Sequence, residues 1–407
     1  MKISREGKGR NRYLDAANEI LETMLSIRRD LHSHPELGMQ ETRTARIIAD
    51  RLKALDLEVR TGVGGTGVVG LLRGSGKGKI PAKTVALRAD IDALPMQDQK
   101  SVEYASKNPG IAHSCGHDAH TAIQLGAAEI LSRSCDVMAG NVKFIFQPSE
   151  DTLPGGAVPM IEAGVLENPK VDAISSLHLG SQFEEGTVVA KAENVSTSSV
   201  SFDLDIHGKG GHIGEPHRVI NPVLLAATLI TSSQTLLPKR TAPGDPIIFD
   251  FCAVHGGTVG NIIPDQVNLK GGIRVASPEL LEQMMREFER MIQGIVENGG
   301  ASYSLRLQEG YPTIYNDPPL LDLWQAAAGK VVGTDKVILH ERIITGGDDA
   351  AFFHQRVPGV YWFLGVHNER GGYTEPLHSP HFDFNEEVLA IGAAVQAQVA
   401  TDYLKRQ

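Results

Sequence analysis

The feature that most constrains this chain is an alternation of strand-like and helix-like segments that is interrupted once. Up to about residue 190, short apolar runs typical of strands, such as residues 142–146, alternate with segments whose apolar residues recur at helical spacing. The alternation resumes near residue 310 and includes a strand over residues 359–366. Such an alternation is typical of an α/β fold, in which helices cover a sheet. We therefore expect a discontinuous α/β domain, formed by residues 1–190 and 308–407, with a mixed sheet flanked by helices.

A different pattern fills the interruption. Residues 198–207 alternate as a half-exposed strand, and Asn221 followed by Pro222 begins a helix, because Asn is a good N-cap and Pro suits the first helical position. Two further strands and a second helix follow, and residues 302–308 form the last strand. The order β-α-β-β-α-β is that of the ferredoxin-like, split βαβ sandwich. We expect residues 191–307 to form such an inserted α+β domain.

Composition narrows the class of protein. The chain has 407 residues, 41% of them hydrophobic and 22% charged, which is typical of a soluble globular protein of two or three domains. A net charge of −10 without a basic stripe argues against a nucleic-acid partner. Three cysteines are too few for a disulfide scaffold. The first residues show no signal-peptide pattern and no segment is apolar enough to span a membrane, so we expect a cytoplasmic protein without a membrane partner.

The densest group of reactive side chains is the segment from His113 to His120. It holds three histidines, Cys115 and Asp118. In extended backbone, positions i and i+2 point to the same side, so Cys115 and His117 can approach one centre. A thiolate with an imidazole suits zinc and similar ions, and Asp118 can orient an imidazole through a hydrogen bond. A polar loop that holds histidines by chance is the alternative reading, and this spacing makes it the weaker one.

Further carboxylates and histidines follow the predicted strands. Ligands of α/β proteins bind at the carboxyl ends of strands, so side chains from several strand ends can meet at one site. Each residue alone has an ordinary explanation, such as a solvated turn or a satisfied structural histidine, but their joint occurrence favours a functional site. These residues are Asp92, Glu150, Asp151 and His178 at strand ends and His378 in a loop between prolines.

One glycine motif is misleading. Residues 62–67 fit the pattern G-x-G-x-x-G of dinucleotide-binding proteins. An apolar strand-like run follows them, whereas a dinucleotide site needs a helix there. We predict a hairpin turn instead.

Six motifs, in this order and spacing, resemble the M20 family of metallopeptidases and amidohydrolases. The closest likeness is to the amidohydrolase branch, which holds aminoacylases, hippurate hydrolases and hydrolases of indoleacetyl-amino acids. The likeness runs from about Arg28 to His381 and implies a catalytic domain interrupted by a smaller lid domain. The motifs are HSCGHDAHT, FIFQPSED, SLHLG, GKGGH, NIIPD and LHSP.

The resemblance also implies a dinuclear metal site. Zinc, manganese, cobalt and nickel all tolerate such a ligand set. Glu150 would be the general base, with Asp92 and Asp118 orienting the ligands. The implied ligands of the two divalent ions are Cys115, His117, Asp151, His178 and His378. The family usually has Glu-Glu where this chain has Glu150-Asp151, and Gly-Ser-Glu-Asp where it has residues 346–349, Gly-Gly-Asp-Asp.

The implied lid carries three further candidates. His212 lies in a glycine-rich turn and would polarise the substrate carbonyl beside a metal ion. Asn261 and Arg274 resemble the binders of a free α-carboxylate, which an arginine can hold bidentately. A structural role for Arg274 is nearly as plausible at this stage.

The predicted function is metal-dependent hydrolysis of the amide bond of N-acyl amino acids by an activated water, with Glu150 as general base. Three alternatives stay open: a carboxypeptidase or dipeptidase of the same family, a cysteine hydrolase with Cys115 as nucleophile, and a non-catalytic metal-binding relative. The resemblance also implies a homodimer or higher oligomer paired through the lid, with each His212 near the other subunit's metals.

Overall fold

The computed structural model describes residues 11–76, 82–242 and 245–405. Its contacts divide the chain into two compact units, which we describe separately. The first unit comprises Met1–Val195, Ile314–Arg342 and Asp348–Gln407, and the second comprises Ser196–Thr313 and Ile343–Gly347.

The boundaries of the units lie a few residues later than the sequence pattern placed them. β7 (Glu193–Asn194) pairs with β14 (Tyr315–Asn316), so the chain leaves and re-enters the first unit along one short antiparallel ribbon. The segment Ile343–Gly347 joins the second unit through a bridge between Ser196 and Ile344. The role of the second unit as a lid remains a prediction.

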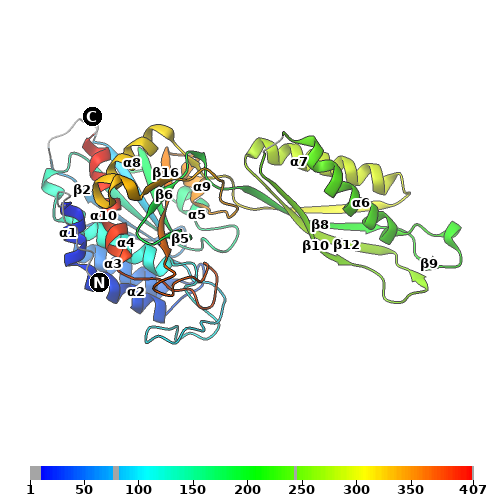
Figure 1. The fold of residues 1–407 in the computed structure, drawn as a ribbon, viewed down its shortest axis with the longest axis horizontal. Coiled ribbons are helices and arrows are strands. Elements are labelled where there is room, and N and C mark those ends of the chain that lie inside the picture. Colours follow the sequence, from blue (N-terminus) through cyan, green and yellow to red (C-terminus); the bar gives the residue numbers. More distant parts are fainter. Residues whose placement is uncertain (1–10, 77–81, 243–244, 406–407) are drawn as a thin grey trace. The chain divides into compact units, whose positions relative to one another are not determined.

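A mixed eight-stranded sheet forms the centre of the first unit (Figure 1). Its strands, in spatial order, are β1 (Glu58–Val63), β2 (Gly67–Arg73), β4 (Asn141–Gln147), β3 (Thr84–Asp90), β5 (Ala173–Glu184), β16 (Gly359–His367), β6 (Val188–Ala190) and β15 (Val337–Leu339). The four strands from β4 to β16 run parallel, while β2 and β6 run antiparallel to their neighbours β4 and β16. The predicted mixed sheet is confirmed.

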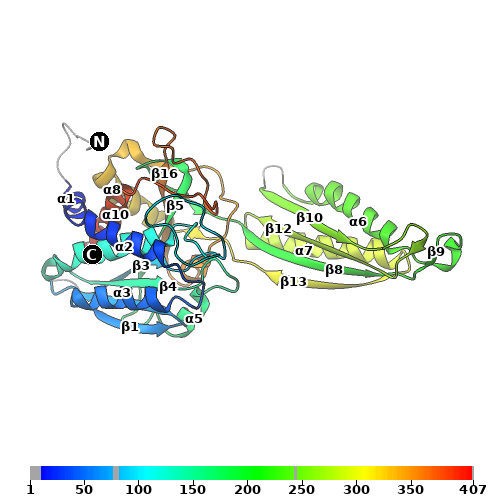
Figure 2. The same cartoon turned by 90° about the horizontal axis from the view of Figure 1, so that it is seen from below.

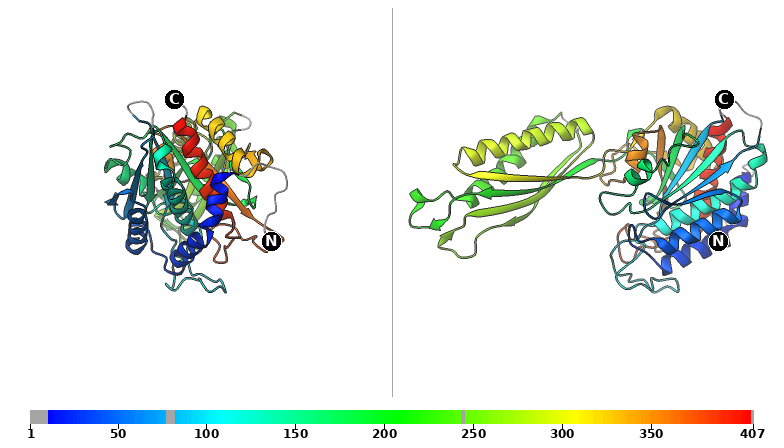
Figure 3. Two further views of the ribbon diagram at one scale, coloured as in Figure 1. Left: turned by 90° about the vertical axis from the view of Figure 1, so that its left-hand side faces the viewer. Right: turned by 180° about the vertical axis from the view of Figure 1, so that it is seen from behind.

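Helices cover both faces of this sheet, but unequally. The larger core lies under α1 (Arg12–Glu19), α2 (Leu21–Ser33), α3 (Thr42–Ala54), α4 (His117–Ser132), α8 (Pro318–Val332) and α10 (Val388–Lys405). The last helix, α10, lies beside both α1 and α4 (Figure 3). The opposite face carries the short helices α5 (Ala157–Glu162) and α9 (Ala350–His354) and a smaller core. Because neighbouring strand residues point to opposite faces, Val68 packs in the first core and Val69 in the second.

The glycine motif at residues 62–67 forms the predicted hairpin. β1 and β2 pair antiparallel, with Val63 opposite Gly67. Residues 64–66 make the turn between them, and no helix follows in this part of the described chain. The predicted hairpin turn is confirmed.

The second unit is a two-layer sandwich (Figure 2). Its antiparallel sheet has the order β10 (Ile247–His255), β12 (Gln266–Val275), β8 (Ser198–His207) and β13 (Ser302–Glu309). α6 (Pro222–Leu236) and α7 (Pro278–Ile292) pack on one face of it around a phenylalanine-rich core. A short ribbon of β9 (Gly211–His212) and β11 (Ile262–Ile263) completes the unit. This is the predicted split βαβ order.

None of the helices in the described part of the chain is long and apolar enough to cross a membrane.

Candidate functional site

The candidate site lies where the parallel strands of the first unit end. β3 ends at Asp90, and β4 ends at Gln147, shortly before Glu150. β5 carries His178 between Leu177 and Leu179, which both pack in the larger core. His178 therefore points to the other face, which carries the two short helices. The carboxyl ends of parallel strands are where α/β proteins bind ligands.

A sharp turn brings the cysteine motif to the same place. Gly116 has a φ of 86° and directly precedes α4, which begins at His117. A Cβ at Gly116 would lie 2.7 Å from a methyl carbon of Leu179, which would have to shift, and the positive φ also favours glycine here. The turn thus sets Cys115 and His117 against the end of β5.

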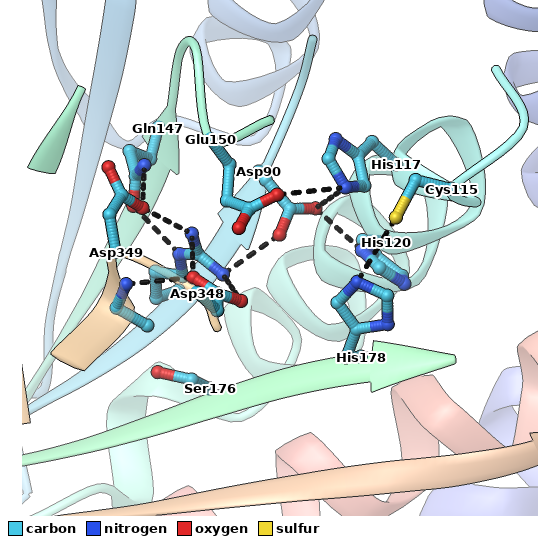
Figure 4. Close-up of polar contacts among 12 residues, drawn as sticks. Asp90, Cys115, His117, His120, Gln147, Glu150, Ser176, His178, Asp348 and Asp349 are labelled. Carbon is cyan, nitrogen blue, oxygen red and sulfur yellow. Dashed lines mark hydrogen bonds and ion pairs between the residues drawn. The ribbon is translucent and has the colours of Figure 1, made fainter. Parts of the chain in front are cut away.

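All five predicted metal ligands converge in the structure. The Cys115 sulfur lies 3.1 Å from Nε2 of His378 and 3.5 Å from Nε2 of His178. One carboxylate oxygen of Asp151 lies 3.5 Å from Nε2 of His378, and the other lies 3.8 Å from Nε2 of His117. Thiolate, imidazole and carboxylate groups at these separations form a ligand set that suits zinc and neighbouring transition metals. Figure 4 shows Cys115, His117 and His178 facing one another.

Hydrogen bonds select the nitrogen that each imidazole offers. Nδ1 of His117 donates to the carbonyl oxygen of Asp92 at 3.0 Å and lies 3.1 Å from its carboxylate. Nδ1 of His178 donates to the carbonyl oxygen of Leu179 at 2.7 Å. A carbonyl can only accept, so both rings carry their proton on Nδ1 when neutral. Nε2 of each ring is left with a lone pair for a cation.

Two buried atoms of the site have no hydrogen-bond partner among the described residues. They are Nε2 of His117 and Oδ2 of Asp151. Burial raises the pKa of Asp151 to about 7, because its charge is poorly solvated. A divalent cation between these groups would satisfy both atoms and favour the charged carboxylate, so the residues fit a metal ion.

His120 looks like a ligand in the sequence but has both ring nitrogens occupied. Nδ1 hydrogen-bonds the Asp90 carboxylate, and Nε2 accepts the N–H of Leu179 at 2.9 Å. His120 therefore supports the peptide that holds His178 in place.

Several buried carboxyl groups surround Arg88 beside the site. Arg88 is fully buried and donates to Asp90, Asp348 and Asp349 at 2.8–3.2 Å, and to Gln147 at 2.9 Å. One positive charge thus faces three carboxylates. In Figure 4, Gln147, Asp348 and Asp349 lie on one side of Asp90, and the histidines lie on the other.

Glu150 lies between this carboxylate group and the candidate ligands. Its carboxylate is 3.7 Å from Nε2 of His117, and an oxygen of it lies within 4.8 Å of oxygens of Asp348 and Asp349. Burial, together with the charges of Asp348 and Asp151, raises the pKa of Glu150 well above its usual value. A carboxylate of raised proton affinity beside a metal site suits general acid–base catalysis.

The structure corrects the role expected of Asp118. Its Oδ2 accepts a hydrogen bond from Nδ1 of His32 at 2.7 Å and lies 2.9 Å from Nε of Arg28. Adjacent residues on a helix face different sides, so Asp118 points away from the ligands although His117 precedes it in α4. Asp118 orients His32 instead, and Asp92 is the aspartate beside Nδ1 of His117.

The three remaining candidates lie in the second unit. His212 is exposed in β9, and its Nδ1 accepts the N–H of Gly214 at 3.1 Å. The carbonyl of Asn261 accepts the N–H of Ile213 at 3.1 Å, so His212 and Asn261 belong to one ribbon. Arg274 lies near the end of β12 and donates to the carbonyl of Thr345 at 3.1 Å. Their roles stay predictions.

Sequence reasoning missed several residues that build the site. A partner for Arg88 could have been predicted, because a charged residue inside an otherwise apolar strand must be paired when it is buried. Asp348 and Asp349 were noticed only as a departure from a family pattern. Nothing in their local sequence connects them to Arg88.

Comparisons with known proteins identify the family of this chain. A model of peptidase family M20/M25/M40 matches residues 86–402. Thermostable carboxypeptidase 1 of Saccharolobus solfataricus is 36% identical over 388 residues, which cover 95% of this chain and 96% of the relative. IAA-amino acid hydrolase ILR1-like 4 of Arabidopsis thaliana is 36% identical over 391 residues, or 95% and 87% of the two chains.

A solved structure is similar over the whole chain. The Bacillus subtilis YXEP protein, described as a dinuclear metal binding peptidase from the M20 family, superposes with a TM-score of 0.82 at 30% identity. The similarity covers 96% of this chain and 100% of that one. From the family model and the near full-length relatives, we conclude that this protein belongs to peptidase family M20/M25/M40 and is a hydrolase that acts on amide bonds.

Proposed function

We propose that this protein hydrolyses the amide bond of N-acyl amino acids with two divalent metal ions. The observation that carries the proposal is the convergence of five side chains of metal-binding type around a buried, unpaired imidazole nitrogen and carboxylate oxygen. The proposed ligands are Cys115, His117, Asp151, His178 and His378. When bound, such ions supply Lewis acidity and a water of lowered pKa.

Glu150 is the proposed general base. Its carboxylate takes a proton from the attacking water and later returns it to the nitrogen of the departing amino acid. Burial and the charge of Asp348 raise the pKa of Glu150, so its carboxylate has a high affinity for the proton that it takes up. The side chain thus serves first as base and then as acid.

Asp151 supports the metal proposal despite its short side chain. The family usually has a glutamate here, one methylene longer. In this chain Asp151 lies within 3.5–3.8 Å of two imidazoles, and its backbone N–H donates to the Asp92 carboxylate at 3.0 Å. The backbone of this loop therefore brings the shorter side chain to the ligand set.

The substrate class follows from the lid candidates and the relatives. Asn261 and Arg274 are proposed to hold a free α-carboxylate, which N-acyl amino acids and small peptides share. The similarity to an IAA-amino acid hydrolase favours an acylated amino acid, whereas the similarity to a thermostable carboxypeptidase makes small peptides the second candidate.

A cysteine hydrolase is disfavoured by the surroundings of Cys115. Burial, followed by the charge of Asp151, raises the pKa of the thiol well above its usual value. A nucleophilic cysteine needs the opposite shift. A bound cation would stabilise the thiolate, but it would also occupy its lone pairs. The described thiols, including Cys115, are free, which supports the proposal of a reducing, cytoplasmic location.

We further propose that a second copy of the chain completes the site. Arg274 lies near one end of β12, where it pairs with Ser199. Gln266 begins β12 at the other end of the sheet. His212 lies beyond that end, in the ribbon of β9 and β11. The eight residue steps from Gln266 to Arg274 span about 26 Å at about 3.3 Å per step. That separation exceeds the length of a small N-acyl amino acid. His212 and Asn261, which share that ribbon, can therefore act on a substrate that Arg274 binds only if they come from a different chain.

The surface around α6 suits such pairing. α6 contains no charged residue, and Val223 and Leu224 on it are 45% and 64% exposed. It lies beside the edge strand β10, which exposes Val254. An unpaired edge strand next to an uncharged helix is a self-complementary surface that a two-fold related copy can cover.

A metal-reconstitution assay tests the proposal. Protein stripped with a chelator is reloaded with zinc, manganese, cobalt or nickel and assayed on a panel of N-acyl amino acids and dipeptides. We expect activity to require metal and to favour N-acyl amino acids. Glu150→Gln should retain the metals while kcat falls by about 10²–10⁴-fold. Activity that survives complete metal removal would favour the cysteine alternative, and metal binding without activity would favour a non-catalytic relative.

A further inference from the structure

The residue before the proposed base has an unusual backbone conformation. Ser149 has a φ of 52°, in the left-handed region that favours glycine. It lies between the end of β4 at Gln147 and the pair Glu150-Asp151. The backbone direction at Ser149 therefore decides where both carboxylates point. Such a conformation persists only where the surrounding structure holds it.

Gly38 and Glu41, which lie between α2 and α3, approach Ser149. Glu41 is fully buried, and its Oε1 accepts the backbone N–H of Ser149 at 2.9 Å. The hydroxyl of Thr66 donates to Oε2 of Glu41 and fixes the carboxylate. Gly38 lies against the same residue, because a Cβ there would be 2.6 Å from Oγ and 3.0 Å from Cβ of Ser149.

The carboxylate of Glu41 does not cap α3, although Glu41 stands at the N-cap position of that helix. Glu36 caps the helix instead and accepts the N–H groups of Arg43 at 3.0 Å and Thr44 at 2.8 Å. Glu36 thus caps α3, whereas Glu41 binds the backbone N–H of Ser149.

We propose that Gly38 and Glu41 form a clamp that positions the general base by holding Ser149 in its left-handed conformation. The inference rests on the proposed role of Glu150 and adds positioning residues outside the metal site. A charge-assisted hydrogen bond to the backbone holds the turn on one side, and the bare glycine lets the segment approach it on the other. Without the clamp, Ser149 returns to a more favourable backbone region and Glu150 moves away from its working position.

The test compares matched glutamate variants in the metal-loaded protein. Glu41→Ala should lower kcat by about 100-fold, the scale expected for an ångström-sized misplacement of a catalytic group, while KM stays within about twofold. Glu41→Gln should recover most of the loss, because the amide oxygen can still accept the N–H of Ser149. Glu36→Ala is the control, since it removes a helix cap and should lower thermal stability but leave kcat unchanged.

A second pair of variants covers the case in which Glu41→Ala does not fold. Gly38→Ala should also lower kcat, because its new Cβ collides with Ser149. Adding Ser149→Gly should restore activity, since it removes Oγ and Cβ and makes the positive φ favourable. If Glu41→Ala and Glu36→Ala change kcat equally, or if Ser149→Gly does not rescue Gly38→Ala, the clamp proposal is wrong. Full activity of Glu150→Gln would instead overturn the proposed base, whatever the clamp variants show.

Discussion

At the scale of single residues, the position of one proton on each imidazole decides what the site can bind. His117 and His178 donate from Nδ1 to backbone carbonyls, which leaves Nε2 free for a cation. Asp92 adds a carboxylate contact at 3.1 Å to the same nitrogen of His117. Such outer contacts fix the ring orientation and raise the basicity of a ligand. Asp118, one residue after His117, has no such contact with a candidate ligand among the described interactions.

Because only Asp92 contacts a proposed ligand, we expect substitutions of Asp92 and Asp118 to change different properties. Asp92→Asn should weaken metal binding by about 10-fold, because a neutral amide replaces the carboxylate beside His117. Asp118→Asn should leave metal affinity unchanged but lower the free energy of unfolding by about 1–3 kcal/mol, since Arg28 and His32 lose a buried charged partner. Competition with a chelating dye measures the first quantity and urea unfolding the second. Equal losses of metal affinity in both variants would contradict the assignment.

At the scale of elements, the loop between β3 and α4 is anchored to α2 by buried polar contacts. Asp98 accepts backbone N–H groups of Lys100 at 3.0 Å and Ser106 at 2.9 Å, and it lies 3.4 Å from Nε2 of His32 on α2. Lys100 donates to the carbonyl of Phe382 at 2.9 Å. These contacts hold the segment that leads into the cysteine motif.

Asp98 predicts a specific pH dependence of stability. Burial alone would raise its pKa, but hydrogen bonds from His32, Ser106 and Lys100 outweigh burial and hold the pKa well below its usual value. Because the folded pKa lies below the unfolded value of about 3.9, the stabilisation is present above about pH 4 and is lost as the pH falls further. Asp98→Asn should therefore cost about 1–3 kcal/mol at pH 7 and less at pH 3.

Urea unfolding at the two pH values measures this difference. Asp50→Asn is the control, because that carboxylate of α3 is 67% exposed and lies 3.9 Å from its partner Lys53. It should change stability little at either pH. A cost of Asp98→Asn that is equal at pH 7 and pH 3 would show that the carboxylate is not preferentially charged in the folded protein.

At the scale of the whole molecule, the separation of His212 from Arg274 predicts complementation between inactive chains. Glu150→Gln lacks the base and His212→Ala lacks the proposed electrophile, so each should be inactive alone. In a mixed dimer, the subunit with intact Glu150 receives His212 of the partner subunit. One site of the two is then complete, and activity should partly return. Mixed dimers verified by differential tags but without recovered activity would mean that His212 acts within its own chain or not at all.

The sequence by itself determined the order of the elements and most of the candidate ligands. Periodicity identifies a strand or helix because the side-chain repeat is a local property of the backbone. The strand-end rule then groups Glu150, Asp151 and His178, since parallel strands share a carboxyl edge. The remaining candidate ligands were predicted from the resemblance of the motifs to the M20 family.

Only the tertiary structure decided which residues surround those ligands. Arg88 bonds Asp348 across 260 residues, and Glu41 holds Ser149 across 108. Neither pair has a local pattern, because contacts between distant segments depend on how the elements pack. The same packing turns Asp118 toward His32 and leaves Asp92 beside His117, a choice that depends on which face of α4 meets the sheet.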